Sequence, residues 1–399
     1  MKILLLNQVF YPDVVATAQY LTELAAALRE RGHAVTVVSS RRAYEHPETL
    51  FPAREQWRGV NIVRIFSTRM GKGAKWRRAV DFASFLAFCC GRLLFLPRHD
   101  VVVALTTPPL ISFIGAWRAK LWRAKFCYWV MDFNPDEAIA AGWLRADSFV
   151  ARFLERLSCF SLRRADGIVA LDRFMKERIT AKGIAPAKVA VIPPWSLDAD
   201  IRFDAVGRDE FRASHGLANK FIVMYSGNHS PVHPMDTLMQ AADRLRNEED
   251  ICFLFVGGGS QFPKIKQWAE RHPRVLCLPY QPLNKLAGSL SAADAQVVVM
   301  GDAMLGLVHP CKLYNIFAVG APVVYIGPDP SHVTEAVKAV GAEFPFVGVR
   351  HGEGDQLAAG LLRLKQLLRT QGRPPAAGER FGAKRLVPQI VAVVENGAR

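Results

Sequence analysis

Residues 296–326 carry a pattern that few architectures accommodate: a buried strand, a loop, a short helix and a second buried strand. Pro310 favours a helix start, because the first helical N–H has no partner inside the helix, and Gly320 favours its end. The loop would bring backbone N–H groups to the N-terminal end of that helix, where phosphate is readily bound. Lys312 lies in the expected first turn and Asn315 one turn later, so this segment is a candidate phosphate site.

The same unit recurs at the start of the chain. A strand at 3–6, a helix at 17–31 and a strand at 34–39 predict the opening of a parallel, doubly wound α/β sheet. Thr17 is the expected cap of that helix. The loop before it lacks G-x-G-x-x-G, which argues against a nicotinamide or flavin site.

The length of 399 residues favours two domains, and the pattern breaks at Pro193-Pro194-Trp195. We expect a first domain at 1–197, a linker at 198–219 and a second, similar domain at 220–377. Asp198-Ala-Asp200 resembles a metal-binding triplet, but a polar linker explains it better. Ligands of parallel sheets bind at the carboxyl ends of the strands, so the two edges are expected to face each other across a cleft.

The positive charge is concentrated in one region. The net charge is +15, and residues 69–125 hold eleven Lys and Arg against Asp81 and Asp100, a net of +9. Helical segments here combine basic with aromatic residues, which suits an anionic membrane surface. The alternative is a solvated basic face on ordinary packing helices, and nucleic acid is disfavoured because no binding-module pattern is present. The residues expected at the membrane are Lys72, Lys75, Trp76, Arg77, Arg78, Arg118 and Arg123.

Cysteine usage and the N-terminus indicate a cytoplasmic protein. Seven cysteines are scattered without disulfide or metal-ligand spacing, which is typical of reduced thiols. The N-terminus is apolar for only four residues before Asn7, which predicts a strand and not a signal peptide. The longest apolar run near the basic region, 82–91, is too short to span a bilayer.

Asp132 follows an expected strand at 126–130, at the sheet edge where α/β proteins place their sites. It is a candidate general acid or base, or an acceptor for a substrate hydroxyl. The alternative is a loop carboxylate satisfied by nearby backbone amides.

The order and spacing of several motifs resemble the retaining GT-B glycosyltransferases of family 4, especially the bacterial subgroup of exopolysaccharide, capsule, O-antigen and colanic-acid assembly. The resemblance covers nearly the whole chain. The segments that carry it are NQVFYPDVVATAQYLTELAAAL (7–28), ALTTPPL (104–110), WVMDFNPDEAIAAGWL (129–144), MYSGNHS (224–230), FVGGG (255–259), LPYQPLNKLAGSLSAADAQVVVM (278–300) and GLVHPCKLYNIFAVGAPVVY (306–325).

The resemblance implies two Rossmann-like domains and a hexosyl- or N-acetylhexosaminyl-transferase that needs no metal or other cofactor. The second domain would bind a nucleotide-sugar donor, and the first would bind a lipid-linked glycan at the inner face of the cell membrane, where the enzyme would be peripherally attached. A final helix at 378–399 would pack back on the first domain.

The resemblance also assigns roles to residues. Asp132 and Lys312 would be catalytic, and Val15, Ala16 and Thr17 would form the acceptor-side loop. The base would lie near Leu278 and Tyr280, the ribose near Asn315, and the diphosphate near Lys312 and the turn after the first strand of the second domain. The full donor set is Gly227, Asn228, His229, His233, Gly257, Gly258, Leu278, Tyr280, Gly306, Leu307, Val308, His309 and Asn315.

The sequence departs from the family at these sites. Two glutamates eight residues apart are replaced by Leu307 and Asn315, and basic phosphate residues are replaced by His229 and His233, which either assist the phosphates or are ordinary turn histidines. A glycine pair in the first loop is replaced by Val14-Val15-Ala16. Two alternative functions therefore stay open: a nucleotide-sugar epimerase of the same fold, and a non-catalytic membrane-associated partner protein.

Overall fold

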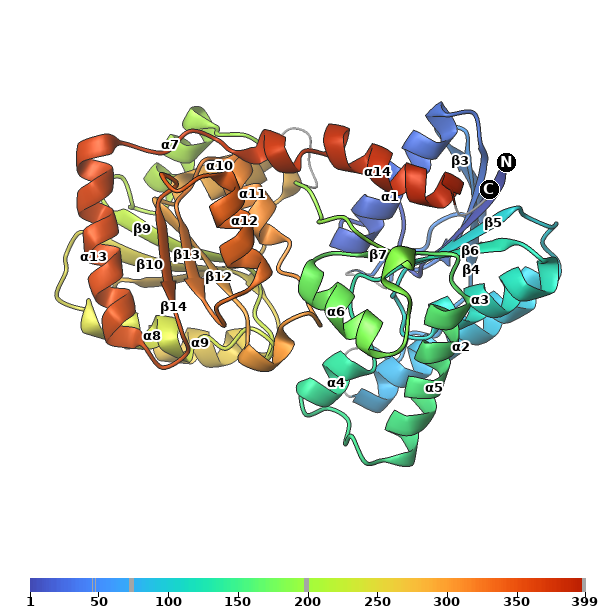
Figure 1. The fold of residues 1–399 in the computed structure, drawn as a ribbon. Helices are drawn as coiled ribbons and strands as arrows, with labels where there is room; N and C mark the ends of the chain where they lie inside the picture. Colours follow the sequence, from blue (N-terminus) through green and yellow to red (C-terminus); the bar gives the residue numbers. More distant parts are fainter. Residues whose placement is uncertain (45, 47, 72–74, 197–200, 397–399) are drawn as a thin grey trace. The chain divides into compact units, whose positions relative to one another are not determined.

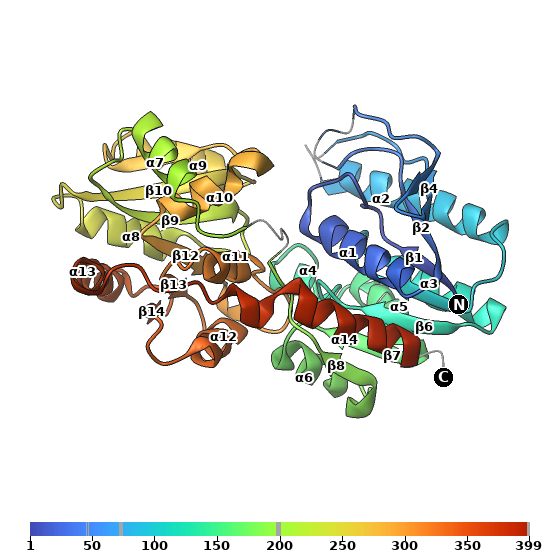
Figure 2. The ribbon, with the colours of Figure 1, turned by 90° about the horizontal axis from the view of Figure 1, so that it is seen from above.

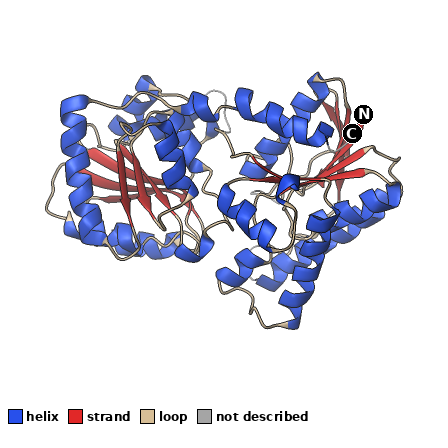
Figure 3. Cartoon of the chain, viewed as in Figure 1, coloured by secondary structure: helices blue, strands red, loops and turns tan. Residues whose placement is uncertain are grey.

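The computed structural model describes residues 1–44, 46, 48–71, 75–196 and 201–396. These form two compact units, each with its own sheet flanked by helices (Figures 1 and 3). The first unit contains Met1–Pro193, Gly306–His309 and the C-terminal segment from Lys384. The second contains Pro194–Leu305 and Pro310–Ala383.

The first unit is built on an eight-stranded sheet of order β3-β4-β2-β1-β5-β6-β7-β8, in which only β3 is antiparallel to its neighbour. Its central strands are continuous apolar runs, because both faces of a parallel sheet are covered. The strands are β1 (Lys2–Leu6), β2 (Ala34–Ser40), β3 (Arg54–Trp57), β4 (Val60–Ile65), β5 (Val101–Ala104), β6 (Lys125–Trp129), β7 (Gly167–Ala170) and β8 (Val189–Val191).

Strand β3 was not expected from the sequence. It pairs with β4 through a two-residue turn at Arg58 and Gly59, both of which have positive φ, as hairpin turns of this length favour. The strand reads REQW, so its polar composition hid an edge strand that the Arg-Gly turn alone could have indicated.

Helices complete the first unit. They are α1 (Ala16–Glu30), α2 (Lys75–Leu94), α3 (Ile111–Trp122), α4 (Asp136–Ala140), α5 (Phe149–Arg164), α6 (Arg173–Ala181), α14 (Ala383–Asn396) and the 3-10 helix η1 (Pro186–Lys188). Thr17 does not cap α1: Val15 holds the N-cap position without a side-chain hydrogen bond, so the hydroxyl of Thr17 lies already inside the first turn. Helix α14, red in Figure 2, packs on this unit, with Glu395 bonded to Arg31 and His33.

The second unit is a six-stranded, all-parallel sheet of order β11-β10-β9-β12-β13-β14. Its strands are β9 (Phe221–Asn228), β10 (Ile251–Gly258), β11 (Val275–Leu278), β12 (Ala295–Val299), β13 (Val323–Ile326) and β14 (Phe346–Val349). Its helices are α7 (Ala205–Ser214), α8 (Asp236–Arg244), α9 (Phe262–Ala269), α10 (Leu283–Ala292), α11 (Lys312–Ala318), α12 (His332–Val340), α13 (Gly354–Gln371) and the 3-10 helices η2 (Asp302–Met304) and η3 (Gly378–Phe381).

Alternating side chains of the central strands fill the two faces of this sheet. Tyr225 and Phe255 pack with α8, α9 and α13 on one face. Met224 and Leu254 pack with α7 and α10 on the other. Because both faces are buried, the carboxyl edge of the sheet is where polar loops are free to gather.

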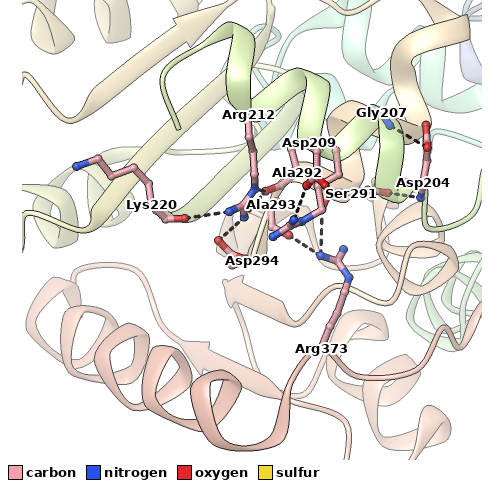
Figure 4. A network of polar contacts seen from close by, with 11 residues as sticks. Asp204, Gly207, Asp209, Arg212, Lys220, Ser291, Ala292, Ala293, Asp294 and Arg373 are labelled. Carbon is pink, nitrogen blue, oxygen red and sulfur yellow. Dashed lines mark hydrogen bonds and ion pairs between the residues drawn. The ribbon is translucent and has the colours of Figure 1, made fainter. Parts of the chain in front are cut away.

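Part of the expected linker is folded. Residues 198–200 lie outside the described residues, but 205–214 form α7, which packs on α10 so closely that Gly207 and Gly288 have no room for a Cβ. The guanidinium of Arg212 donates to the carbonyl of Ala292 and pairs with Asp294 at 2.6 Å (Figure 4). The range 198–219 was therefore wrongly assigned as a linker. The helix within it is mostly polar and has only a narrow apolar face, so its sequence resembles that of a loop.

The segment 296–326, the candidate phosphate site, also differs in detail from its prediction. Its helix α11 begins at Lys312 and not at Pro310, and it spans seven residues. Among the described residues no helix combines the length and apolarity needed to cross a membrane.

Candidate functional site

The predicted donor residues of the second unit meet at the carboxyl edge of its sheet. Gly227 and Asn228 end β9, and Gly257 and Gly258 lie beside them at the end of β10. The backbone N–H of His229 donates to the carbonyl of Gly258 at 2.7 Å and holds the two turns together. Four of the predicted donor residues thus lie side by side.

Lys312 is the central cation of this edge. Its Nζ lies 3.3 Å from the ring centroid of Tyr225, is buried, and has no hydrogen-bond partner within the described part of the chain. Gly227, with φ +140°, leaves room for it: a Cβ there would lie 3.0 Å from Nζ. Burial lowers the pKa of Lys312 well below its usual value. A buried amine that lacks an anionic partner is costly, so this position points to a bound anion.

Two histidines flank the lysine. The ring of His229 is fully buried, with ring centroids of Tyr225 and Phe262 each 4.8 Å away, and its Nε2 has no partner in the described residues. His233 bonds the carbonyl of Val299 through Nδ1 at 2.7 Å. Burial, reinforced by the Lys312 charge, lowers the pKa of His229 to about 4 and that of His233 to about 3. Both rings are therefore neutral at pH 7, and neither adds positive charge to the site.

The tautomers of these rings follow from their partners. A carbonyl oxygen only accepts, so Nδ1 carries the proton where it contacts Gly258 or Val299. Nε2 is then an acceptor in both neutral rings. A phosphate oxygen would be bound at these positions only if a ring takes up a proton.

The remaining predicted donor residues of this unit lie along the same edge. Leu278 ends β11 and is half-buried, while Tyr280 is exposed with its ring against Gly258. Asn315 in α11 accepts a hydrogen bond from the hydroxyl of Ser196 at 2.8 Å. Ser196 was not anticipated, since a single serine after a proline pair carries no sequence signal.

Residues Gly306–His309 were predicted to contact the donor, but they cluster with the first unit. The carbonyl of Leu307 accepts from the N–H of Phe133 at 3.0 Å, and Nδ1 of His309 bonds the carboxylate of Asp172 at 2.8 Å. Gly306 abuts the backbone of Phe174, and Val308 is buried. The tertiary structure thus anchors this loop beside Asp132.

Asp132 lies after β6 on the carboxyl edge of the first sheet and is half-buried. Its backbone N–H donates to the hydroxyl of Thr106, but no backbone amide among the described residues donates to its carboxylate. Burial raises the pKa of Asp132 to about 6. The alternative of a loop carboxylate satisfied by backbone amides therefore has no support in the hydrogen bonds.

A second carboxyl group, which the sequence analysis missed, lies next to Asp132. Burial, together with the Asp132 charge, raises the pKa of Glu137 to about 8, while Asn134 and Arg78 oppose the rise. Asp136 differs from both, because it pairs with Lys182 at 3.0 Å. The short helix α4 turns Glu137 toward Asp132, and the D-x-x-x-x-E spacing was the only available signal.

The comparisons with known proteins agree with this arrangement. Residues 16–195 match the glycosyl transferase 4-like domain. WcaI of Escherichia coli (strain K12), named for glycosyl transfer in colanic acid biosynthesis, is 26% identical over 349 residues, or 81% of this chain and 83% of that protein. WbjE of Pseudomonas aeruginosa, named as a glycosyltransferase, is 23% identical over 333 residues, or 82% of this chain and 80% of that protein.

The chain is a glycosyltransferase that contains a glycosyl transferase 4-like domain.

Its fold has counterparts among solved structures. The structure of Anabaena HepE in complex with UDP superposes with a TM-score of 0.69 at 16% identity, and the match covers 99% of this chain and 100% of that chain. This likeness shows the fold, which is GT-B: two parallel-sheet α/β domains.

The glycosyltransferase begins α1 with Val15, Ala16 and Thr17, the predicted acceptor-side loop. The carbonyl of Val15 accepts from the backbone N–H groups of Ala18 and Gln19. With a helix start here in place of a glycine pair, these three residues offer mainly backbone and apolar atoms.

Only some of the predicted membrane residues of the glycosyltransferase are on its surface. Trp76, Arg77 and Arg123 are exposed. Arg78 is exposed as well, and its guanidinium donates to the hydroxyl of Tyr44 at 3.1 Å. Arg118 is half-buried, with its guanidinium 4.2 Å from the ring centroid of Trp122. Lys72 and the side chain of Lys75 lie outside the described residues. Arg118 is thus only partly exposed, because the ring of Trp122 on α3 covers part of its guanidinium.

Proposed function

We propose that this glycosyltransferase moves a sugar from a nucleotide-sugar donor to a lipid-linked glycan acceptor in cell-envelope polysaccharide synthesis. Transfer proceeds with retention of configuration at the sugar and without a metal ion. The names of WcaI and WbjE and the UDP bound to HepE support the proposal. The observation that carries it is the buried, unpaired Nζ of Lys312 beside Gly227.

In this proposal the second unit binds the donor. The nucleoside diphosphate leaving group gains negative charge as its bond to the sugar breaks. The ammonium group of Lys312, fixed against Tyr225 in a site that excludes water, stabilises that charge more effectively than the same group in solution. Asn315 lies within the same unit and bonds the ribose.

The first unit binds the acceptor in this proposal. Its carboxylate at Asp132 accepts a hydrogen bond from the acceptor hydroxyl and orients it for attack. The exposed basic and aromatic residues of the same unit attach the enzyme to the anionic inner face of the membrane.

A thermal-shift screen against nucleotides and nucleotide-sugars tests donor binding, since a bound ligand raises the apparent stability. We expect UDP, or another nucleoside diphosphate, to stabilise the wild type and not Lys312→Ala. Lys338→Ala, which removes an exposed lysine of α12, is the matched control and should behave as wild type. Equal stabilisation of wild type and Lys312→Ala would overturn the phosphate assignment.

Asp132→Asn separates the acceptor role from folding. It should lower turnover while the affinity for the nucleotide stays unchanged. A parallel loss of both would instead indicate a folding defect.

A further inference from the structure

The carboxyl edge of the first sheet carries hydrogen-bond acceptors that lack donors. Gln8 follows β1 and is 9% exposed, yet its Oε1 has no hydrogen-bond partner in the described residues. Oδ1 of the fully buried Asn7 likewise has no hydrogen-bond partner in the described residues. A buried amide oxygen without a donor costs free energy, so it indicates a ligand that supplies one.

These groups lie on the same edge as Asp132. The backbone N–H of Gln8 donates to the carbonyl of Thr107 at 2.7 Å, and the hydroxyl of the preceding Thr106 accepts from the N–H of Asp132 at 3.3 Å. Loops after β1, β5 and β6 are thereby tied together.

The pair Asp132 and Glu137 adds two more acceptors. Asn134 donates to Glu137 at 3.4 Å, but no ion pair involves either carboxylate within the described chain. The charged and titratable groups that face the pair are Arg78 from α2 and Tyr128 from β6, whose own pKa burial raises to about 12. Tyr128 is therefore neutral. With one proton shared by Asp132 and Glu137, the pair carries one negative charge, which the positive charge of Arg78 balances.

We propose that Gln8 and Glu137 act together with Asp132 as the recognition residues for the acceptor, and that the unit they bind is a neutral sugar presented through its hydroxyl groups. The inference rests on the proposed function for the statement that the first unit takes the acceptor. Sugar hydroxyls supply the O–H donors that these atoms lack. A uronic acid or a phosphate would instead place an anion against two carboxyl groups.

The unpaired polar groups at the sheet edge of the second unit differ from those of the first, which supports assigning the neutral sugar to the first unit. There the unpaired amine of Lys312, beside the neutral acceptor Nε2 of His229, fits an anion, whereas the unpaired amide oxygens of Asn7 and Gln8 at the first edge fit O–H donors. The two edges therefore select ligands of different chemistry.

Saturation-transfer NMR with methyl glycosides in the presence of UDP tests the inference. We expect signals from methyl glucoside, galactoside or mannoside and none from methyl glucuronide. Gln8→Met and Glu137→Gln should weaken binding of the neutral glycosides about fivefold each, the effect of one lost or weakened hydrogen bond. Asp136→Asn, which alters the neighbouring carboxylate paired with Lys182, should leave the signals unchanged.

The pH dependence distinguishes recognition from a merely structural role. As the pH rises through about 8, Glu137 loses its proton and becomes a charged acceptor, which binds sugar O–H donors more strongly than the neutral acid does. Glycoside binding should therefore rise between pH 7 and 9 in the wild type and stay flat in Glu137→Gln.

Three results would overturn the inference: equal binding of glucuronide and neutral glycosides, absence of binding by every neutral glycoside, or an unchanged pH profile in Glu137→Gln. UDP affinity, measured separately, reports on the proposed function. If UDP binds and neutral glycosides do not, the inference fails and the donor assignment stands. If neutral glycosides bind and no nucleotide does, the donor assignment fails and the inference stands.

Discussion

At the scale of single residues, the polar groups that are left unpaired distinguish the two edges. Lys312 and His229 are buried against aromatic rings, which gives them a fixed geometry and takes away their solvation. Burial lowers the pKa of both side chains, so the donor site by itself holds less positive charge than its composition suggests. A diphosphate reverses this effect, because a nearby negative charge favours the protonated forms.

Donor binding should therefore take up a proton. Because the pKa of Lys312 is low in the free protein and rises beside phosphate, UDP affinity should increase as the pH falls from 9 to 7, by at most about tenfold per pH unit for one proton. Calorimetry at pH 8 in HEPES and in Tris measures the proton directly, since the two buffers differ in ionisation heat and neither contains phosphate. Identical binding heats in the two buffers would contradict the prediction.

At the scale of elements, close approach of backbones explains why α7 belongs to the second sheet. A Cβ on Gly288 would lie 2.7 Å from backbone atoms of Gly207. Arg373 separately fixes the C-terminal end of α10, since its guanidinium donates to the carbonyls of Ser291 and Ala293 (Figure 4). The packing of α7 on α10 thus requires glycine at position 288, although the sequence of α7 resembles a linker.

Gly288→Val should push α7 away from α10 and lower the free energy of unfolding by about 1–3 kcal/mol, the usual cost of overpacking. Urea unfolding measures the change, and Lys285→Ala, on the exposed side of α10, serves as the control. A Gly288→Val protein as stable as the control would show that the two helices can separate at no cost.

Helix α2 has apolar side chains on two faces. Phe85, Cys89 and Leu93 are fully buried against the unit, while Trp76 and Phe88 are 58% and 50% exposed. An exposed apolar stripe next to basic residues is typical of a helix that lies in a membrane interface.

Charged contacts and apolar contacts between this helix and a membrane respond differently to salt. We expect the protein to sediment with vesicles that contain anionic lipid at low salt and to be partly released at high salt, because exposed charges are screened. Arg77→Ala should weaken binding mainly at low salt, and Phe88→Ser at both, because salt does not screen apolar burial. Absence of sedimentation with anionic vesicles at low salt would exclude this membrane surface.

At the scale of the whole molecule, the C-terminal helix completes the first unit. Residues Leu386, Ile390 and Val394 of α14 are buried, and its Glu395 bonds the guanidinium of Arg31 at 2.7 Å. The first core therefore depends on residues from both ends of the chain, whereas the second unit draws on one stretch of chain that Gly306–His309 interrupts.

A chain that ends at residue 382 should destabilise the first unit alone. Hydrogen exchange in β7 and α1 should accelerate, because Gly167 loses its contact with Val393 and Arg31 loses its partner. Exchange in the second unit and UDP affinity should stay unchanged. Unaltered exchange in β7 and α1 would show that α14 does not contribute to this core.

The sequence by itself determined the α/β class and the parallel sheets, because apolar periodicity and glycine placement are local properties of the chain, while its resemblance to a known family indicated the class of enzyme. It also indicated Lys312, Asp132 and the glycine turns, since residues that follow buried strands meet at one edge. It misassigned α7 and missed β3, because their short polar segments are held by contacts with distant residues.

Only the tertiary structure decided how these residues act. Whether Lys312 has an anionic partner, whether Glu137 turns toward Asp132 and which unit holds Gly306–His309 all depend on contacts between loops far apart in the sequence. Burial then sets the charge of each group, because the free energy of a charge depends on the surrounding atoms and not on its neighbours along the chain.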